Sequence, residues 1–352
     1  MEKLTFCLYA DLHYKKGMYI PAVSDMLAIL ERAQKAEAAF CIHCGDFCND
    51  YSRSPELVNA CLQNTQDLPT YGVYGNHELE SAGNSMEVVT PLLCNRPVMW
   101  GTDSGAIEDG RVAYYYFDTG AFRIIGLDTN YSLTPDGTWE HNHTASWGPP
   151  AANTCGNALG PVQLAWLETV LMDAAKEGKH CLLFSHASFA GNWGMSPDGE
   201  AVQALFRQVN AQSAQKPGTV IAAFNGHYHT DHAAVVEDVV YIDVNTVRNN
   251  LWLPVGSEHY TTETFDFTNY DECGTPISTE QRLLSTLSMA RNTWFSDAPL
   301  SAIVTVTEDG TVTVEGAVAN WYGGIVPETM REGKGPRITS GTYAAKPMGK
   351  RS

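Results

Sequence analysis

The chain has 352 residues, enough for one large or two small domains, and its 44% apolar and 18% charged content is typical of an ordinary globular protein. Its formal net charge of −18 argues against a nucleic-acid backbone as the main partner, because such partners are bound mainly by lysine and arginine. No apolar stretch reaches the roughly 20 residues of a membrane span, and the N-terminus lacks the pattern of a secretion signal. The sequence therefore predicts a soluble, cytoplasmic protein with no membrane partner.

Nine cysteines are scattered over the chain, which does not match the disulfide framework of a small secreted domain. We interpret them as reduced and mostly buried thiols. The cluster Cys41, Cys44 and Cys48 raises the alternative of a zinc or iron–sulfur site. Cys41 and Cys44, however, are an odd number of positions apart on a predicted strand, so they face opposite sides, and no second CxxC motif exists.

The first predicted strand ends in a carboxylate and an imidazole. Residues 4–10 are a short apolar run typical of a buried strand, and Asp11-Leu12-His13 follows it. Side chains two positions apart on extended backbone point the same way, so Asp11 and His13 are predicted to face one side. A capping aspartate and an unrelated histidine are the alternative.

Two further strands end in the same kind of chemistry. Residues 40–44 lead into a Gly-Asp pair that places the Asp46 carboxylate on a tight turn. Residues 70–74 lead into Asn76 and His77. An asparagine carboxamide oxygen can bind a metal ion and a neighbouring histidine can act in acid–base chemistry, although Asn76 is also an ordinary turn residue.

The last two such strands end in histidines. Residues 181–184 precede His186, which taken alone is as easily structural. Residues 220–224 precede His227 and His229 beside a flexible glycine. On extended backbone these two imidazoles would leave the strand on one side, as metal ligands do, and a surface loop that happens to contain histidines is the alternative.

The remaining pattern predicts helices and strand pairs around these five strands. The predicted helices cover residues 21–39, 55–65, 84–93, 164–175, 201–209 and 279–290. The predicted strand pairs join 111–117 with 122–127, 233–236 with 239–244, and 301–307 with 311–317.

One long segment and the C-terminus fall outside that pattern. Residues 131–160 are rich in proline, glycine, asparagine and threonine, and carry His141 and His143. We expect a lid or binding loop there, or else a packed cover over apolar surface. We expect residues 1–325 to form one domain that contains this insert and a C-terminal strand extension, and residues 326–352 to be a mobile tail.

Together, the five strand ends indicate one site. Strands and helices alternate, as in a layered α/β protein, and ligands gather beyond the carboxyl ends of strands in such sheets. The donors are carboxylates, imidazoles and one carboxamide, which suit Mn, Fe or Zn. Seven candidates are too many for one tetrahedral ion, so the sequence predicts two ions with Asp46 as the natural bridge. The candidate metal ligands are Asp11, His13, Asp46, Asn76, His186, His227 and His229.

The ordered series DLH, GDFCN, GNHE, SH and GHYH resembles the five-block signature of the calcineurin-like metallophosphoesterases over residues 5–245. The resemblance implies a four-layer α/β/β/α sandwich of two mixed sheets flanked by helices. It also implies that one ion is held by Asp11, His13, Asp46 and His229, and the other by Asp46, Asn76, His186 and His227.

The resemblance further implies a reaction. The protein would be a metal-dependent phosphoric ester hydrolase in which a hydroxide bridging the two ions attacks phosphorus, with Asp46 and His77 as catalytic residues and His77 beside the substrate as proton donor or orienting group. The motifs look most like the bacterial cyclic-nucleotide phosphodiesterase branch, and the absence of a tyrosine ligand separates them from purple acid phosphatases.

Four properties of the protein are left open by its residues. The substrate, a small phosphate ester, can be a monoester, a diester or a cyclic nucleotide; His141, His143 and Arg248 are candidates to contact it. A non-catalytic metal-binding or scaffold protein with a vestigial site, and a nuclease, are the competing functions. The identity of the ions and the oligomeric state do not follow from the residues.

Overall fold

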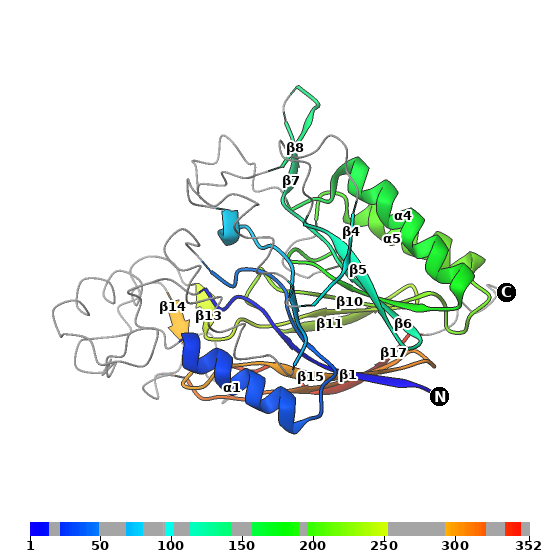
Figure 1. Cartoon of the computed structure of the whole chain (residues 1–352). Helices are drawn as coiled ribbons and strands as arrows, with labels where there is room; N and C mark the ends of the chain where they lie inside the picture. The colour runs from blue at the N-terminus through cyan, green and yellow to red at the C-terminus, as the bar shows by residue number, and fades with distance from the viewer. Residues whose placement is uncertain are drawn as a thin grey trace.

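The protein forms a four-layer sandwich in its computed structural model, with two mixed β-sheets packed face to face and helices on both outer faces (Figure 1). This is the α/β/β/α architecture predicted from the sequence. The structure describes residues 1–13, 22–48, 68–79, 94, 96–101, 113–134, 136–141, 157–190, 196–252, 293–321 and 335–345.

The first sheet contains the N-terminal strand at its centre and has the order β17-β16-β15-β1-β2-β3. The strands β1, β2 and β3 are parallel, so their carboxyl ends lie at one edge of the sheet, while β15, β16 and β17 continue it with antiparallel pairing. The strands are β1 (Lys3–Tyr9), β2 (Cys41–His43), β3 (Thr70–Gly72), β15 (Ala302–Thr307), β16 (Thr311–Gly316) and β17 (Gly341–Ala344).

The second sheet has the order β11-β12-β10-β9-β6-β5-β4 and is also mixed. The four central strands β12, β10, β9 and β6 run parallel, and antiparallel strands close both sides. The strands are β4 (Met99–Trp100), β5 (Tyr115–Thr119), β6 (Phe122–Gly126), β9 (His180–Phe184), β10 (Val220–Asn225), β11 (His232–Val236) and β12 (Val239–Asp243).

Three α-helices lie within the described ranges, and each turns one apolar face to a sheet. Helix α1 (Ala22–Lys35) covers the first sheet, and α4 (Gly160–Glu177) and α5 (Gly199–Gln212) lie side by side over the second (Figure 1). Alternate residues of the central strands pack against α4 and α5, and the residues between them face the other sheet, as the period of two requires.

Aromatic rings fill the space between the two sheets. The Phe6 ring stacks on Phe40 at 5.2 Å between centroids and meets Phe184 and Phe224 edge-on at 5.5 and 5.4 Å. All four rings are buried, and edge-on or offset arrangements of this kind add stability beyond the area they bury. This core holds the carboxyl ends of β1, β2, β9 and β10 in fixed relative positions.

Two small antiparallel pairs extend from the sandwich. Strands β7 (Tyr131–Leu133) and β8 (Trp139–His141) form an arm that projects at the top of Figure 1. Strands β13 (Asn249–Trp252) and β14 (Thr293–Phe295) pair beside the start of α1. The arm is the described start of the 131–160 insert.

The predicted elements agree with the structure in kind and differ at their ends. Helix α1 ends at Lys35 instead of 39, and α4 begins four residues before the predicted 164. The stretch predicted as a mobile tail contains β17, which pairs with β16 and brings Tyr343 against the core between the sheets. The predicted helices at 55–65, 84–93 and 279–290 lie outside the described residues.

Candidate metal centre

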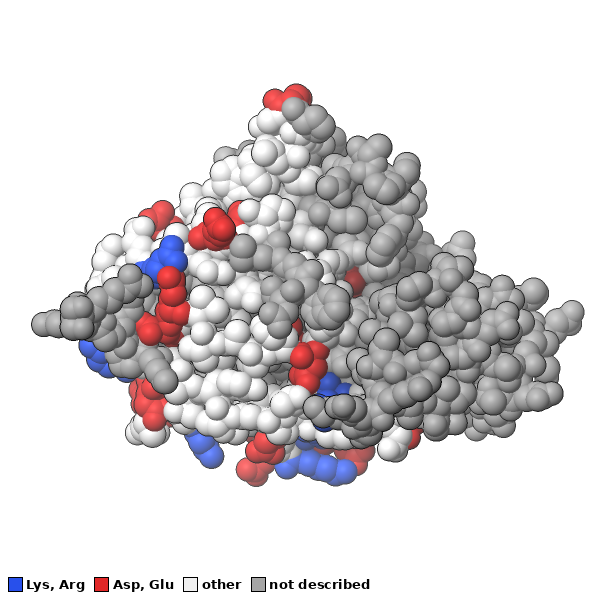
Figure 2. Space-filling view, turned by 180° about the vertical axis from the view of Figure 1, so that it is seen from behind, with Lys and Arg blue, Asp and Glu red and all other residues white. Residues whose placement is uncertain are grey.

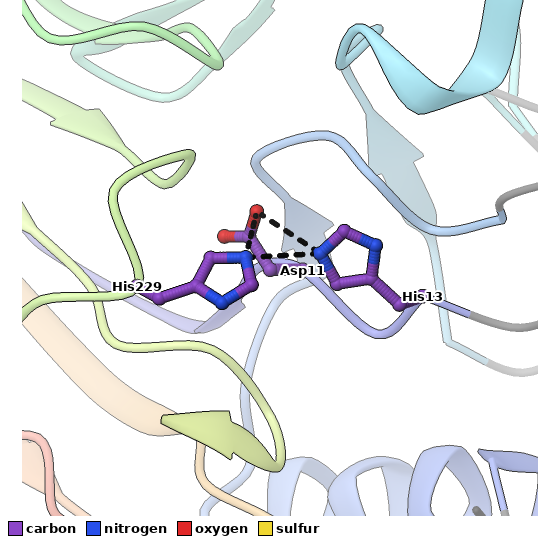
Figure 3. A group of neighbouring side chains, drawn as sticks. All are labelled: Asp11, His13 and His229. Atoms are coloured by element: carbon purple, nitrogen blue, oxygen red, sulfur yellow. Dashed lines mark hydrogen bonds and ion pairs between the residues drawn. The ribbon is translucent and has the colours of Figure 1, made fainter. Parts of the chain in front are cut away.

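The polar residues predicted at the five strand ends come together at one edge of the sandwich. Asp11, His13 and His229 form a buried group in which Nε2 of His13 lies 2.9 Å from Nε2 of His229 (Figure 3). An oxygen of Asp11 lies 3.4 Å from the same nitrogen of His229 and 3.9 Å from that of His13. Residues separated by more than 200 positions therefore present ligand atoms to one point.

A second group forms beside the first. Nε2 of His186 lies 3.1 Å from Oδ2 of Asp46 and 3.0 Å from Nδ1 of His227. Oδ1 of Asn76 lies 3.2 Å from the same nitrogen of His186. The group therefore contains one carboxylate, two imidazoles and one carboxamide oxygen, all directed at a common centre.

Asp46 connects the groups. Its Oδ2 lies 3.9 Å from Nε2 of both His13 and His77, and the ligand atoms of these three residues lie close enough together to hold an ion. The His77 ring packs edge-on against the His13 ring, with 4.8 Å between centroids. Asp46 therefore lies close to candidate ligands of both groups. The His77 side chain lies beside Asp46 and is 15% exposed, so the site is partly open on this side.

The backbone at these positions is unusual. Asp11, His13, Asp46, His227 and His229 all have positive φ, between 50° and 72°. Only glycine adopts this left-handed region readily, and such strain concentrates at functional sites. These residues lie beyond the strand ends in left-handed backbone, so the extended conformation predicted for them is wrong. His227 and His229 would point the same way on extended backbone. With left-handed backbone at both residues, they belong to different groups.

Two motif glycines allow the backbone to approach the carboxylates. A Cβ atom on Gly75 would lie 2.1 Å from Oδ1 of Asp46, and one on Gly226 would lie 2.5 Å from Oδ2 of Asp11. Both distances are too short for a real contact, so any larger residue would displace the carboxylate. The backbone N–H of His77 donates to Oδ1 of Asp46 at 2.9 Å and fixes its direction.

Glu78, the last residue of the GNHE block, has a structural role that the sequence did not predict. Its fully buried carboxylate accepts hydrogen bonds from the backbone N–H groups of Asp46 (2.9 Å), Gly75 (2.5 Å) and Cys48 (3.0 Å). It therefore joins the loop after β2 to the loop after β3. Burial, together with the nearby Asp46, raises the pKa of Glu78 to about 7. The sequence feature that could have indicated this role is the position of Glu78 in the GNHE block.

The electrostatics of the site favour a cation. Burial alone would raise the pKa of Asp46, but His186 and His77 outweigh it and hold the pKa well below its usual value. Burial would lower the pKa of His186, but Asp46 and Asp11 raise it to about 10. When no ion is bound, the carboxylates therefore keep His186 protonated. Its positive charge stands where a bound cation would supply one.

The other donors are in the form that metal binding requires. Burial lowers the pKa of His13 to about 4 and that of His227 to about 3, so both rings are neutral near pH 7. Nδ1 of His186 lies 2.7 Å from the Cys44 carbonyl oxygen and donates to it, which directs Nε2 into the site. Burial and Asp11 raise the pKa of the Cys44 thiol well above its usual value, so no thiolate competes.

The turn at residues 128–130, directly after β6, lies beneath two of the ligand loops. Its Thr129 hydroxyl accepts a hydrogen bond from the backbone N–H of Ala187 at 3.2 Å. The Asn130 amide donates to the Tyr74 carbonyl oxygen at 3.5 Å. The turn therefore contacts the chain next to His186 and next to the loop that holds Asn76. No sequence pattern marked it.

His141, a predicted substrate contact, is instead turned into this turn. Its Nε2 lies 2.7 Å from Oδ2 of Asp128, and both side chains are fully buried. Burial would raise the pKa of Asp128, but the His141 partner holds it below its usual value. The pair fastens β8 to the end of β6. His143 lies outside the described residues.

Arg248, the other predicted substrate contact, is engaged by α1. Its guanidinium forms a two-point ion pair with Asp25, including Nη2 to Oδ1 at 2.6 Å, and donates to the Ser296 carbonyl oxygen at 2.9 Å. The neighbouring Thr246 hydroxyl donates to the backbone oxygen of Asp11 at 2.7 Å. Residues 246–248 therefore contact both α1 and the loop after β1.

Comparison with known proteins decides the family. The family model described as calcineurin-like phosphoesterase matches residues 4–231. The chain belongs to this family. As a calcineurin-like phosphoesterase it is a metal-dependent phosphoric ester hydrolase, as the sequence predicts. No curated protein matches the chain.

This calcineurin-like phosphoesterase is similar to several solved structures. A dimetal phosphatase from Danio rerio superposes with a TM-score of 0.57 at 13% identity, over 97% of this chain and 99% of that chain. A candidate 5′-nucleotidase from Staphylococcus aureus gives a TM-score of 0.47 at 15% identity, over 94% of this chain and 56% of its own. GAP50 from Plasmodium gives 0.46 at 11% identity, over 99% and 90%. The Danio rerio likeness confirms the sandwich architecture.

The remaining sequence predictions concern nucleic-acid and membrane partners. On the face shown in Figure 2, the described lysine and arginine side chains are few and lie among acidic ones, with no basic stripe among them. No helix of the described residues is long and apolar enough to cross a membrane.

Proposed function

We propose that this phosphoesterase carries two metal ions and hydrolyses a small phosphate monoester or diester, with cyclic nucleotides among the diesters. Asp11, His13, Asp46 and His229 would hold one ion. Asp46, Asn76, His186 and His227 would hold the other. When bound, the pair of ions supplies the Lewis acidity that polarises a phosphate ester and activates water.

The observation that carries this proposal is the shared membership of the ligand groups. Asp46 belongs to the group with His186 and His227 and also to the group with His13, while His13 belongs to the group with Asp11 and His229. Two separate single-ion sites would not share a carboxylate. A bridging carboxylate between two adjacent ions accounts for the arrangement.

The donor set also fits the ions in its chemistry. Nitrogen and oxygen donors without thiolate suit Mn, Fe or Zn. Nε2 of His13 and Nε2 of His229 face each other at 2.9 Å, and two ring nitrogens this close can share at most one proton. A cation between them and Asp11 would satisfy all three groups at once, as buried polar atoms require.

The residues around the ions would orient the ester and handle protons. Glu78 and the 128–130 turn hold the Asp46, Asn76 and His186 loops, which keeps the donors in place before the substrate arrives. His77 is 15% exposed, more than the buried ligands, so it can reach a bound ester. In the proposed role its ring gives a proton or a hydrogen bond to the leaving oxygen.

His77 has a second candidate role, because its ring nitrogen also lies among ligand atoms with His13 and Asp46. Replacing His77 with Ala separates the roles. A proton donor predicts that turnover falls while metal content stays normal. A ligand or support for the ions predicts that metal content and turnover fall together.

Metal analysis and a substrate panel test the proposal. We expect two ions per chain in the purified protein, and hydrolysis of aryl phosphate mono- or diesters with added Mn. Asp118→Asn is the matched control, because this carboxylate pairs with Arg123 on the hairpin of β5 and β6. A stoichiometry of one ion or none, or hydrolysis that resists complete chelation, would contradict the proposal. Steep loss of activity with salt would instead favour a nuclease.

A further inference from the structure

The outer side of His227 faces a residue at the end of the insert. His227 directs Nδ1 toward Nε2 of His186, 3.0 Å away, and so toward the candidate centre. Its other ring nitrogen, Nε2, lies 3.4 Å from the side-chain amide nitrogen of Asn157. The two nitrogens of one imidazole therefore have different environments, one formed by ligands and the other by Asn157.

Asn157 is held firmly in this position. The Ser196 hydroxyl lies within hydrogen-bonding distance of the Asn157 carbonyl oxygen and of Oδ1 of Asp198. The other oxygen of Asp198 accepts hydrogen bonds from the backbone N–H groups of Leu159 (2.8 Å) and Gly160 (3.1 Å). A buried serine and a carboxylate at the start of α5 thus fix residues 157–160 beside His227.

A neutral imidazole carries one ring proton, and this limits how His227 can bind an ion. If Nδ1 gives its lone pair to the ion, the proton must be on Nε2, and Nε2 then needs a hydrogen-bond acceptor. The oxygen and nitrogen of a carboxamide exchange places by a half-turn of the side chain. Asn157 can therefore present Oδ1 to Nε2–H without any movement of the backbone.

We propose that Asn157 is a positioning residue that accepts a hydrogen bond from Nε2–H of His227 and thereby keeps Nδ1 available as a ligand. This inference rests on the proposed dinuclear centre. Partners of this kind on a ligating histidine typically change metal affinity by about 10–100-fold when removed. Asn157 contacts His227, and not His229, among the hydrogen bonds of the described residues, so it acts on one of the two ions.

Zinc titration of two variants tests the assignment. Asn157→Ala should weaken one of two zinc-binding events by about 10–100-fold and leave the other unchanged. Asn157→Asp keeps the size of the side chain and offers only acceptors, so it should retain or strengthen that event. Asn320→Ala is the control, because Asn320 is exposed and bonds Asp297. The unchanged binding event reports that the variant is folded.

The tautomer of His227 provides a readout that a purely structural role would not change. In the zinc-loaded, ¹⁵N-labelled protein, long-range ¹⁵N–¹H spectra should show the His227 ring protonated at Nε2, with the signal assigned by its loss in His227→Gln. Equal weakening of both zinc events, no weakening in Asn157→Ala, or a ring protonated at Nδ1 would each overturn the inference. Failure of the wild-type protein to bind two zinc ions would overturn the dinuclear proposal, and this inference with it.

Discussion

The core between the two sheets and the loops just beyond it are continuous along the same strands, yet their chemistry is opposite. Phe6, in the middle of β1, is surrounded by aromatic rings, whereas Asp11, two residues past the end of β1, is an ionised carboxylate with left-handed backbone. Burial stabilises the first region and opposes the charge of the second. A rigid apolar core therefore holds in place a set of loops that would not be stable alone.

The largest expected effect is functional and comes from the loop region. Asp46→Asn keeps the size of the side chain and an oxygen for the His77 N–H, but it removes the proposed bridge. We expect turnover to fall by about a thousandfold, because the ions contribute several kcal/mol to transition-state stabilisation. The measurement is kcat with saturating Mn. Activity within roughly tenfold of wild type would contradict the bridging role.

The same variant should leave the metal-free fold nearly intact. His186 can release its proton when the Asp46 charge is removed, so no unpaired buried charge remains. Chemical denaturation in the presence of a chelator should therefore show a change smaller than about 2 kcal/mol. A larger loss would mean that the site stabilises the core, which reverses the proposed relation between the two regions.

The largest effect on stability should come from the core. Phe6→Ala removes a ring that touches three other phenylalanines and should lower the free energy of unfolding by about 3–5 kcal/mol. Phe6→Leu is the control and should lose far less, because it fills most of the volume. Denaturant titration measures both. Similar losses in the two variants would show that the core tolerates a cavity there.

How much of this could be predicted from the sequence differs between the two regions. The strands and the candidate donor residues followed from apolar runs that end in Asp, Asn and His, whereas the four layers were implied by the resemblance to a known family. The conformation of the donors did not, because positive φ at Asp11 or His229 is imposed by the neighbouring loops and not by local preference. Tyr343 and β17 were missed because a short strand near the C-terminus is stabilised by pairing with a distant edge.

Side chains that support the site were harder still to predict. Glu78 was visible within a motif, but its three backbone partners lie on two different loops. The bond from Ala187 to Thr129 joins residues 58 positions apart, and nothing in their local sequence records it. His141 was expected to contact substrate because it lies in the segment predicted as a lid or binding loop, whereas it pairs with Asp128, 13 positions earlier in the chain.

A smaller effect should come from the link between the two ligand loops. Glu78→Gln places an amide donor among three backbone N–H groups that need acceptors. We expect a loss of about 1–3 kcal/mol in the free energy of unfolding of the metal-free protein, measured by denaturant titration. Metal affinity should fall as well, because the loops of Asp46 and Asn76 lose their common anchor. Unchanged stability would show that water replaces the lost acceptor.

The smallest effect should be a gain in stability. It tests whether glycine relieves the strain of left-handed backbone at a position away from the site. Glu237 and Asp238 form the two-residue turn between β11 and β12 with φ of 47° and 75°. Glycine suits such a turn, so Asp238→Gly should raise the free energy of unfolding by about 0.5–1 kcal/mol, seen as a higher midpoint of thermal unfolding. Asp238→Ala should not. Glycine at His229 would bring the same relief but remove a proposed ligand.

Both ends of the insert attach to the same half of the candidate centre. It begins after the turn that contacts Ala187 and Tyr74, and it ends at Asn157 beside His227. The other half of the centre, with Asp11 and His13, is instead held by the hydrogen bond from the Thr246 hydroxyl to the backbone oxygen of Asp11. A change in the described ends of the insert should therefore alter the group around His186 and His227 more than the group around Asp11 and His13.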